Sequence, residues 1–492
     1  MVDESLPAEL KPCAEYKAQS PHWKFFLDSY ECGWRLLSKD YVFAHARETS
    51  VDFLNRLQRA TPTGYARTVI NSYKSLLSRA PITRKHTDAS LTQFVDANAD
   101  GMGTGLTQLI YERIFPINQS CGIAWILVDM PKPEVTPLTL ADEKAIGMEP
   151  YCVVYPPTDI INWRFDGFGR LQFVTVKLPV ESSTDTLQPV GPEHEYKAWT
   201  ADEWKLYDSK GRLVESGSHG AGRVPFVVSY NERSIINQFQ GVSAINNIAY
   251  INREIFNLWS LLQDFMYRQC LNILTLPDSL LADVDEQTGK RTIEIGTGNA
   301  LPIGQGEHPG AYLAPPTDPA QFLIQTLEKD VLRIYDEAKL KGGSASQTPS
   351  EQSGISKAFD FHETNMLLAK KAQNLEDTER GIVDLWARHK GMASVDFETS
   401  YARTFDLTDA TDEIDELTKF LNIPVPILET KRERLRRAMQ ALFSDASEEV
   451  KGIISDEIDS VEMGQAAPAA SGAPGPAISS LAQRLGLGRA AA

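Results

Sequence analysis

The feature that most limits the fold of this chain is a stripe of apolar residues at helical spacing between Gly241 and about Cys270. Its steps alternate between three and four residues, which places the side chains on one face of a helix. At a rise of ~1.5 Å per residue, such a helix is about 40 Å long. A helix of that length with one apolar face needs a partner along most of its length. The stripe consists of Ile248, Ile251, Ile255, Leu258, Leu262 and Phe265.

A second long helix, predicted at residues 317–341, has the same need for a partner. Asp318 is a suitable N-cap, Pro319 fits the first helical position, and Gln321 completes a capping box. The residues between the two helices, 271–316, are rich in glycine and proline and contain short strand-like runs. The pattern therefore predicts two long helices around a small β-rich insertion.

A pair of glycines is expected to end the second helix and to open a segment of small and polar residues at 342–354. The segment, GGSASQTPSEQSG, contains no large apolar side chain, so we expect it to be mobile. A third helical pattern follows immediately from Ile355 to Lys390, and Gly391 closes it. At ~1.5 Å per residue this third helix is roughly 54 Å long.

The rest of the chain predicts an α+β body and a helical C-terminal part. Residues 1–240 alternate helical and strand signals. Between 151 and 230, turn signals separate runs of β-branched and aromatic residues, which indicates an antiparallel sheet. A strand at 394–401 is expected to return to that sheet. Charged helical sequence fills 408–462, and we expect the Ala/Pro/Gly-rich tail at 463–492 to be disordered.

The charge balance argues against a protein that grips nucleic acid by its phosphates. Such a protein needs an excess of Lys and Arg to displace counterions, whereas this chain has 49 basic and 66 acidic residues and a net charge of −17. Its five cysteines are spread out and contain no C-x-x-C pair, which fits a reducing cytosol. The polar N-terminus predicts no signal peptide, and the sequence predicts no membrane span.

One motif resembles the start of a calcium loop. Asp96, Asn98, Asp100 and Gly101 match the D-x-N-x-D-G pattern, but the twelfth position, which needs a bidentate glutamate, is Thr107. We therefore expect a polar turn ahead of a helix that begins at Leu106, and no metal.

Other motifs for cofactors and catalysis are incomplete. Two glycine pairs within 296–306 lack the third glycine of a dinucleotide loop, and no G-x-x-x-x-G-K-[ST] sequence occurs. His362-Glu363 begins like a zinc-protease helix, but residue 366 is Met instead of the second histidine. A Ser/His/Asp triad stays open, although the G-x-S-x-G elbow is absent. We expect no cofactor and no enzymatic activity.

The order of these elements resembles the portal (head-to-tail connector) proteins of tailed double-stranded DNA bacteriophages over essentially the whole chain. The phrases at 155–163 and 222–226 fit the same family. The resemblance implies an α+β portal fold with an α/β wing, a two-helix stem, a small β-rich clip, a tunnel loop followed by a long helix, and a helical crown. Its parts are the wing at 1–240 and 355–407, the stem helices at 241–270 and 317–341, the clip at 271–316, the tunnel loop at 342–354, the crown at 408–462 and the disordered tail at 463–492.

The resemblance also implies a role in the virion. Portal subunits form a dodecameric ring at one capsid vertex, the channel for genome packaging and ejection. The implied partners are the terminase large subunit, head-tail adaptor or tail proteins, the major capsid protein and a scaffold protein, with assembly in the host cytoplasm and no membrane. Double-stranded DNA passes through the ring without sequence specificity. Long helices with one apolar stripe suit a closed ring of heterologous contacts, and an acidic channel wall would repel phosphate and let DNA slide.

Two groups of residues are candidate DNA contacts on this resemblance. The tunnel loop offers hydrogen bonds with little charge, and its alternative reading is a plain surface linker. The basic cluster of the crown either touches packaged DNA or forms a solvated face that pairs with nearby acids. The loop residues are Gly342, Gly343, Ser344, Ser346, Gln347, Thr348, Ser350, Glu351 and Gln352, and the crown residues are Lys431, Arg432, Arg434, Arg436 and Arg437.

Two other classes of function remain open. The first is another head-tail structural protein, such as an adaptor or tail-tube subunit, although those chains are usually shorter. The second is an α+β enzyme with a helical appendage, which would need a convergent set of titratable residues and would be favoured by a nucleotide or metal requirement.

Overall fold

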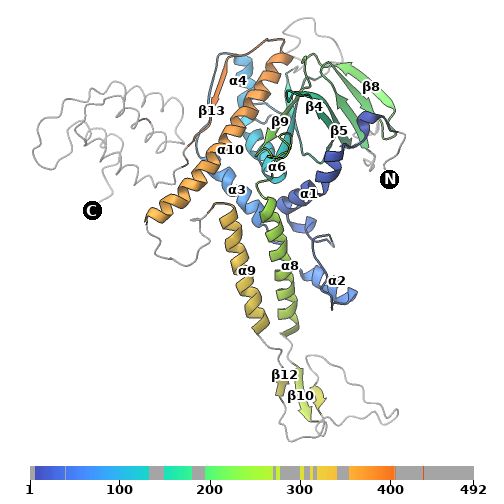
Figure 1. The fold of residues 1–492 in the computed structure, drawn as a ribbon, viewed down its shortest axis with the longest axis vertical. Coiled ribbons are helices and arrows are strands. Elements are labelled where there is room, and N and C mark those ends of the chain that lie inside the picture. The colour runs from blue at the N-terminus through green and yellow to red at the C-terminus, as the bar shows by residue number, and fades with distance from the viewer. Residues whose placement is uncertain are drawn as a thin grey trace, which may run out of the picture. The chain divides into compact units, whose positions relative to one another are not determined.

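The computed structural model describes residues 6–38, 40–131, 149–179, 194–269, 273–277, 300–303, 311–313, 318–340, 354–403, 405 and 436. The chain divides into two units, Met1–Phe405 and Asp406–Ala492. Only Arg436 is described in the second unit, and it is helical. The first unit combines helices with sheets that are antiparallel except for one pair of strands (Figure 1), which confirms the predicted α+β class.

The strands between Ile123 and Tyr230 form two sheets, where the sequence predicted one. A three-stranded sheet has the order β3-β2-β9, and its central strand is buried over its first six residues. A five-stranded sheet follows the chain order from β4 to β8, with every neighbouring pair antiparallel. The strands are β2 (Ile123–Asp129), β3 (Tyr151–Tyr155), β4 (Ile160–Phe165), β5 (Leu171–Pro179), β6 (His194–Trp199), β7 (Glu203–Tyr207), β8 (Leu213–Ser218) and β9 (Phe226–Tyr230).

The predicted return of the strand at 394–401 to this sheet is wrong. Strand β13 (Phe397–Ser400) pairs instead with β1 (Thr83–His86) in a separate two-stranded sheet. The physical reason is an anchor beside the strand. Tyr401 donates a hydrogen bond of 2.7 Å to Glu379, and Arg84 of β1 forms an ion pair with the same carboxylate.

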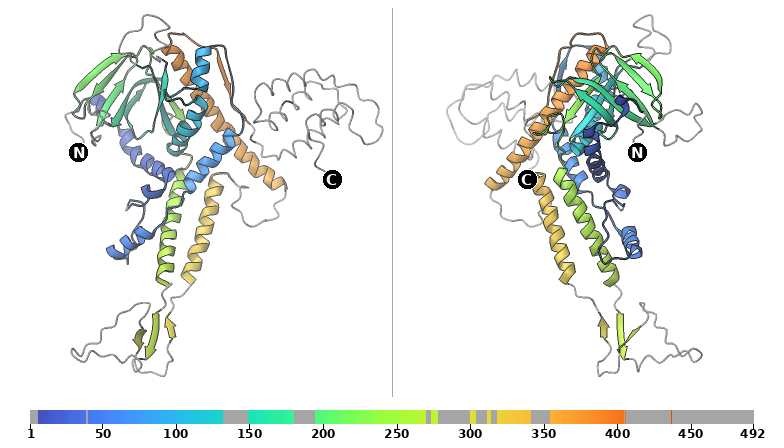
Figure 2. Two further views of the ribbon diagram at one scale, coloured as in Figure 1. Left: turned by 180° about the vertical axis from the view of Figure 1, so that it is seen from behind. Right: turned by 45° about the vertical axis from the view of Figure 1, so that its right-hand side comes forward.

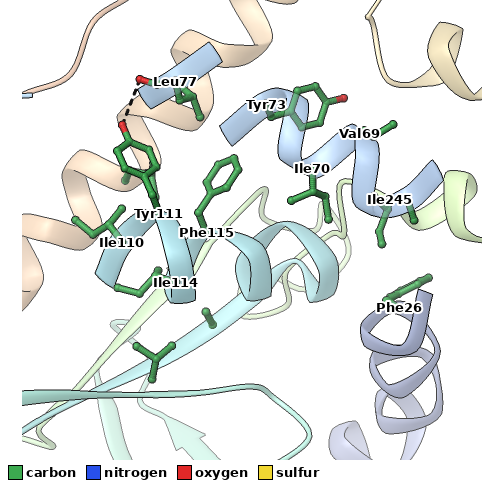
Figure 3. Close-up of a cluster of buried hydrophobic side chains, with 14 of the residues drawn as sticks. Phe26, Val69, Ile70, Tyr73, Leu77, Ile110, Tyr111, Ile114, Phe115 and Ile245 are labelled. Atoms are coloured by element: carbon green, nitrogen blue, oxygen red, sulfur yellow. Dashed lines mark hydrogen bonds between the residues drawn. The ribbon is translucent and has the colours of Figure 1, made fainter. Parts of the chain in front are cut away.

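The main core lies where several helices meet β2. Helices α1 (Ala14–Glu31), α3 (Tyr65–Ser78) and α4 (Ala89–Asp96) contribute to it. The predicted helix at Leu106 continues as far as Cys121 through α5 (Leu106–Leu109), a π-helical turn (Ile110–Ile114) and α6 (Phe115–Cys121). Figure 3 shows part of this core, formed by Phe26, Val69, Ile70, Tyr73, Leu77, Ile110, Tyr111, Ile114, Phe115 and Ile245.

The π-helical turn has a local cause. Phe115 donates its N–H to the carbonyl of Ile110, five residues back, and the next residue, Pro116, has no N–H to continue the α-helical ladder. Gly122, with a φ of 79°, then ends α6. A Cβ on Gly241 would lie 2.0 Å from the Gly122 carbonyl oxygen. This close approach fixes the chain that leads into the next long helix.

Three long helices follow the sheets. Helix α8 (Asn246–Gln269) begins five residues after Gly241. The chain between them is held to the end of α6, because the Ser243 hydroxyl donates a hydrogen bond of 2.6 Å to the Ser120 carbonyl oxygen. Helix α9 (Asp318–Glu337) pairs with α8, and helix α10 spans Gly354–His389. Gly391, with a φ of 73°, lies just beyond the end of α10.

Helix α9 ends earlier than the predicted glycine pair. Its stop is Lys339, which has a φ of 55°. The N–H of Leu340 bonds the Tyr335 carbonyl at 3.0 Å, and the N–H of Lys339 bonds the Asp336 carbonyl at 3.1 Å. These two bonds form a Schellman cap, which satisfies the last carbonyls without glycine.

A three-stranded sheet lies between α8 and α9 in the sequence. Strand β10 (Ile273–Pro277) pairs parallel with β11 (Ala300–Ile303) and antiparallel with β12 (Ala311–Leu313). Among the helices of the described residues, none is long and apolar enough to cross a membrane.

Candidate subunit interface

The residues predicted to contact DNA fall almost entirely outside the described part of the chain. The tunnel-loop candidates at 342–352 lie in the undescribed range 341–353. Of the crown cluster, only Arg436 is described. Their role therefore stays a prediction, and so do the predicted crown and tail.

The motif at Asp96–Gly101 forms a hydrogen-bonded turn. The Asp100 carboxylate accepts N–H bonds from Met102 at 2.8 Å and Thr104 at 3.0 Å. The Asn98 side-chain oxygen accepts the N–H of Gly103 at 2.9 Å. These oxygens thus hold the chain in place before α5. Within the described ranges, no group of three or more His, Cys, Asp or Glu side chains is placed to hold a metal ion.

Helix α8 has two different contact faces. Ile251, Ile255 and Leu262 are buried on the first face, in the core that also holds Leu327 and Ile334 of α9. The second face lies about half a turn away, at ~100° per residue. It contacts residues 33–59, which we call the arm; they include helix α2 (Ser50–Arg59). Figures 1 and 2 show α8 between α9 and α2 in every view. The second face of α8 consists of Arg253, Asn257, Ser260 and Asp264.

Polar contacts anchor the arm to α8. Asn257 donates to the Tyr41 carbonyl at 2.9 Å and accepts the N–H of Phe43 at 2.9 Å. Arg56 is only 1% exposed and donates to the Ser260 hydroxyl at 2.6 Å. The same guanidinium forms two bonds of 2.8 Å to Glu48, and these hydrogen bonds lower the pKa of that carboxyl. A buried arginine with all these partners holds the arm in one position.

The outward surfaces on both sides of α8 expose large apolar side chains. On the arm, Trp34 is 77% exposed and Val51 is 68% exposed. On α9, Phe322 is 70% exposed. Single exposed apolar residues are normal, but clusters of them on a fixed surface indicate contact with another protein. The remaining members are Leu37, Phe43 and Leu54 on the arm, Ile324 and Leu332 on α9, and Trp259, Met266 and Tyr267 on α8.

A second feature fixes α10 against the body. Lys371, Asn374 and Thr378 lie on one face of α10 and form what we call the polar seam. Lys371 donates to the side-chain oxygens of Gln119 and Asn231, the latter at 2.7 Å. Burial lowers the pKa of Lys371 to about 7.

The other two seam residues bond the end of β9. Asn374 donates to the Asn231 carbonyl, and Thr378 donates to the Ser229 hydroxyl at 2.9 Å. All the acceptors lie at the end of α6 or the end of β9. Because each seam residue has a specific partner, a shift of α10 along its axis would break several hydrogen bonds at once.

Sequence reasoning missed both the arm and the seam. Leu54 and Leu57 fall at helical spacing, which is typical of a core-facing helix, yet Leu54 is exposed and the buried positions of α2 are Phe53 and Arg56. From the sequence, Lys371 is expected to be a solvent-exposed residue on a charged helix. Only its spacing of three and seven residues from Asn374 and Thr378 hints at a shared face.

Comparisons with known proteins include a distant structural likeness. No protein-family model and no curated protein matches the sequence. One solved structure that aligns with the chain is titled "Neck of empty GTA particle computed with C6 symmetry". It has 11% sequence identity and a TM-score of 0.38, and the alignment covers 84% of this chain and 94% of that chain. A TM-score this low carries no argument, so function is inferred from the surfaces of the chain itself.

Proposed function

We propose that this chain is a head-to-tail structural subunit of a tailed phage particle, specifically the portal subunit. It forms a ring at one capsid vertex, the genome enters and leaves through the ring, and the chain itself catalyses no reaction. The terminase motor docks on the ring during packaging, and adaptor or tail proteins dock on it afterwards.

One observation carries this proposal: α8 lies between two different elements, the arm and α9, and each of them exposes large apolar side chains on its outward side. Two different surfaces with exposed apolar side chains, on opposite sides of one helix, suit heterologous contacts, in which each copy binds the next in the same way. Such contacts close into a ring when the rotation between copies allows it. The order of a helix, a small sheet, a second helix and a long third helix supports a stem and clip within that ring.

The charge of the chain supports passage of DNA without tight binding. A net charge of −17 per copy makes a ring strongly acidic, and an acidic wall repels phosphate instead of trapping it. The tunnel loop at 342–354 then makes weak contacts that do not depend on base sequence.

Negative-stain electron microscopy of the purified chain tests the proposal. We expect closed rings of about twelve copies with a central hole, and a chain that stays monomeric at every concentration and salt would count against it.

An adaptor ring in the same neck is the second candidate, because exposed apolar side chains on both sides of α8 suit any ring. The partner separates the two functions. A portal ring binds the terminase large subunit directly, whereas an adaptor ring binds only after a portal ring is present. Co-sedimentation of purified rings with terminase, with and without another portal, distinguishes them.

A further inference from the structure

We propose that the contact between the C-terminal end of α10 and the loop after β8 opens when two histidines in this contact, His219 and His389, are protonated. The contact lies within one copy of the chain, so the inference does not depend on the proposed ring. We call residues 219–223 the junction loop. They lie between β8 of the five-stranded sheet and β9 of the three-stranded sheet.

Two contacts join the junction loop to α10. The first is made by His389, the last residue of α10. Its Nε2 lies 2.9 Å from the Val128 carbonyl oxygen at the end of β2, and the backbone of His219 hydrogen-bonds the same ring. The second is an ion pair of 2.9 Å between Arg223 and Asp384. Both side chains of this pair are about 40% exposed, so water screens it. The histidines therefore contribute most to the contact.

The ring of His219 holds the junction loop in its neutral form. Its Nε2 lies 3.0 Å from the Thr200 carbonyl oxygen, which can only accept a hydrogen bond. Its Nδ1 lies 3.3 Å from the backbone nitrogen of Ala221, whose N–H can only donate one. Both contacts are satisfied by the neutral tautomer that carries its hydrogen on Nε2. A proton on Nδ1 would face the N–H of Ala221, so protonation removes this bond.

Two glycines allow the junction loop to move when this bond is lost. Gly220 and Gly222 flank the buried Ala221 and have φ values of 71° and 66°. Glycine adopts and leaves such conformations at little cost. A Cβ at either glycine would meet no atom within 4 Å. The buried Ala221 is therefore held between two positions that have space around them.

The surroundings of His389 also disfavour a charged ring. Burial has the largest effect and lowers the pKa of His389 below its ordinary value of 6.5. The nearby His219 side chain acts in the same direction, whereas Asp129 and the backbone contacts raise the pKa by less. The other charged groups around this end of α10 form ion pairs: Arg388 with Asp384 at 3.2 Å, Lys390 with Glu149 at 2.7 Å, and Lys197 with Asp129 at 3.9 Å.

Acid should therefore weaken the contact. Above pH 6.5, His389 is neutral whether the contact is closed or open, so the contact has its full strength. As the pH falls below 6.5, the open form binds a proton that the closed form resists, so the closed form loses stability. The loss is complete below the lowered pKa of the closed form. Opening frees this end of α10, whereas the polar seam still holds the middle of the helix.

Hydrogen exchange of the full chain, measured by mass spectrometry at pH 6.8 and pH 5.2, tests the inference. In this range Lys371 of the polar seam is already mostly protonated, so the seam is an internal reference. After correction for the intrinsic effect of pH on exchange, amides of 219–223 and 385–391 should lose protection severalfold at pH 5.2. Amides of 370–378 should keep theirs. Unchanged protection of the junction loop, or an equal loss in the seam, would overturn the inference.

Glutamine variants test whether the two histidines cause the opening. His219→Gln and His389→Gln each keep a side-chain N–H and do not titrate. Each should reduce the loss of protection at pH 5.2, and the double variant should abolish it. A variant whose junction loop is already unprotected at pH 6.8 would support that ring as a closing contact.

The matched control is His362→Gln, at an exposed histidine of the same helix. It should show the same loss of protection as the wild-type chain. A full acid-dependent loss in the double glutamine variant would overturn the assignment to His219 and His389, and so would a loss that His362→Gln abolishes.

Discussion

Lys371 is 4% exposed, and its ammonium group donates hydrogen bonds to two neutral side-chain oxygens, those of Gln119 and Asn231. Burial lowers its pKa from 10.5 to about 7. The charged groups around it have smaller effects: Glu232 on the loop after β9 raises the pKa, and the neighbouring Lys370 lowers it. The Tyr73 ring of α3 lies 5.0 Å from the ammonium nitrogen.

This shift makes stability depend on pH in a defined direction. Below pH 7, Lys371 is protonated in both the folded and unfolded chain, so the full cost of burying the charge is present. Between pH 7 and 10.5 the unfolded chain still binds the proton and the folded chain does not, so stability rises with pH. Integrated from pH 7 to 8.5, the gain from this residue is roughly 1.5 kcal/mol.

Urea unfolding at pH 7 and pH 8.5, followed by tryptophan fluorescence, measures this gain. Trp386 is fully buried on the same helix and reports on its packing. The matched control is Lys371→Met, which keeps the length of the side chain and removes its titration. The wild-type chain should gain about 1.5 kcal/mol more than the variant between the two pH values. An equal pH dependence in both proteins would refute the reasoning.

Three further perturbations probe the arm, the entry to α8 and the loop. Arg56→Ala should cost about 3–5 kcal/mol in urea unfolding and expose the arm to protease, because buried partners lose their cation. Lys85→Ala removes one side of an ion pair that is exposed at both ends and should cost under ~1 kcal/mol. Gly241→Ala should lower the free energy of unfolding by more than ~2 kcal/mol, because the added Cβ would collide with the backbone of Gly122. The control Gly167→Ala should hardly change the melting temperature, because its added Cβ meets no atom within 4 Å. Deleting residues 345–348 should impair DNA packaging or genome retention while rings still assemble; normal packaging would contradict the tunnel role.

The parts of the fold visible in the sequence are those set by local periodicity. The apolar stripe from Ile248 to Phe265 predicts α8 correctly, because a 3.6-residue period can be recognised from neighbouring residues alone. The pairing of β13 with β1 could not be predicted, because it depends on Glu379, a buried partner nearly 300 residues from Arg84. The division of the strands into two sheets has the same origin, since pairing between strands is not encoded in either strand alone.

The candidate interface was only half visible. Apolar stripes on the long helices indicated that they need partners, but not which faces are already covered within one copy. The arm was not predicted, because the residue that anchors it is polar. From the sequence, Arg56 is expected on the surface, but it is one of the largest fully buried side chains among the described residues. Polar residues at helical spacing therefore carry structural information that hydrophobic patterning alone misses.

A cryo-electron microscopy reconstruction of the assembled chain tests the central claim most directly. We predict a closed ring with an axial channel wide enough for a DNA duplex, with α8 and α9 of each copy in its stem. A ring without an open channel, or a closed dimer with the outward faces of α9 left in solvent, would contradict it.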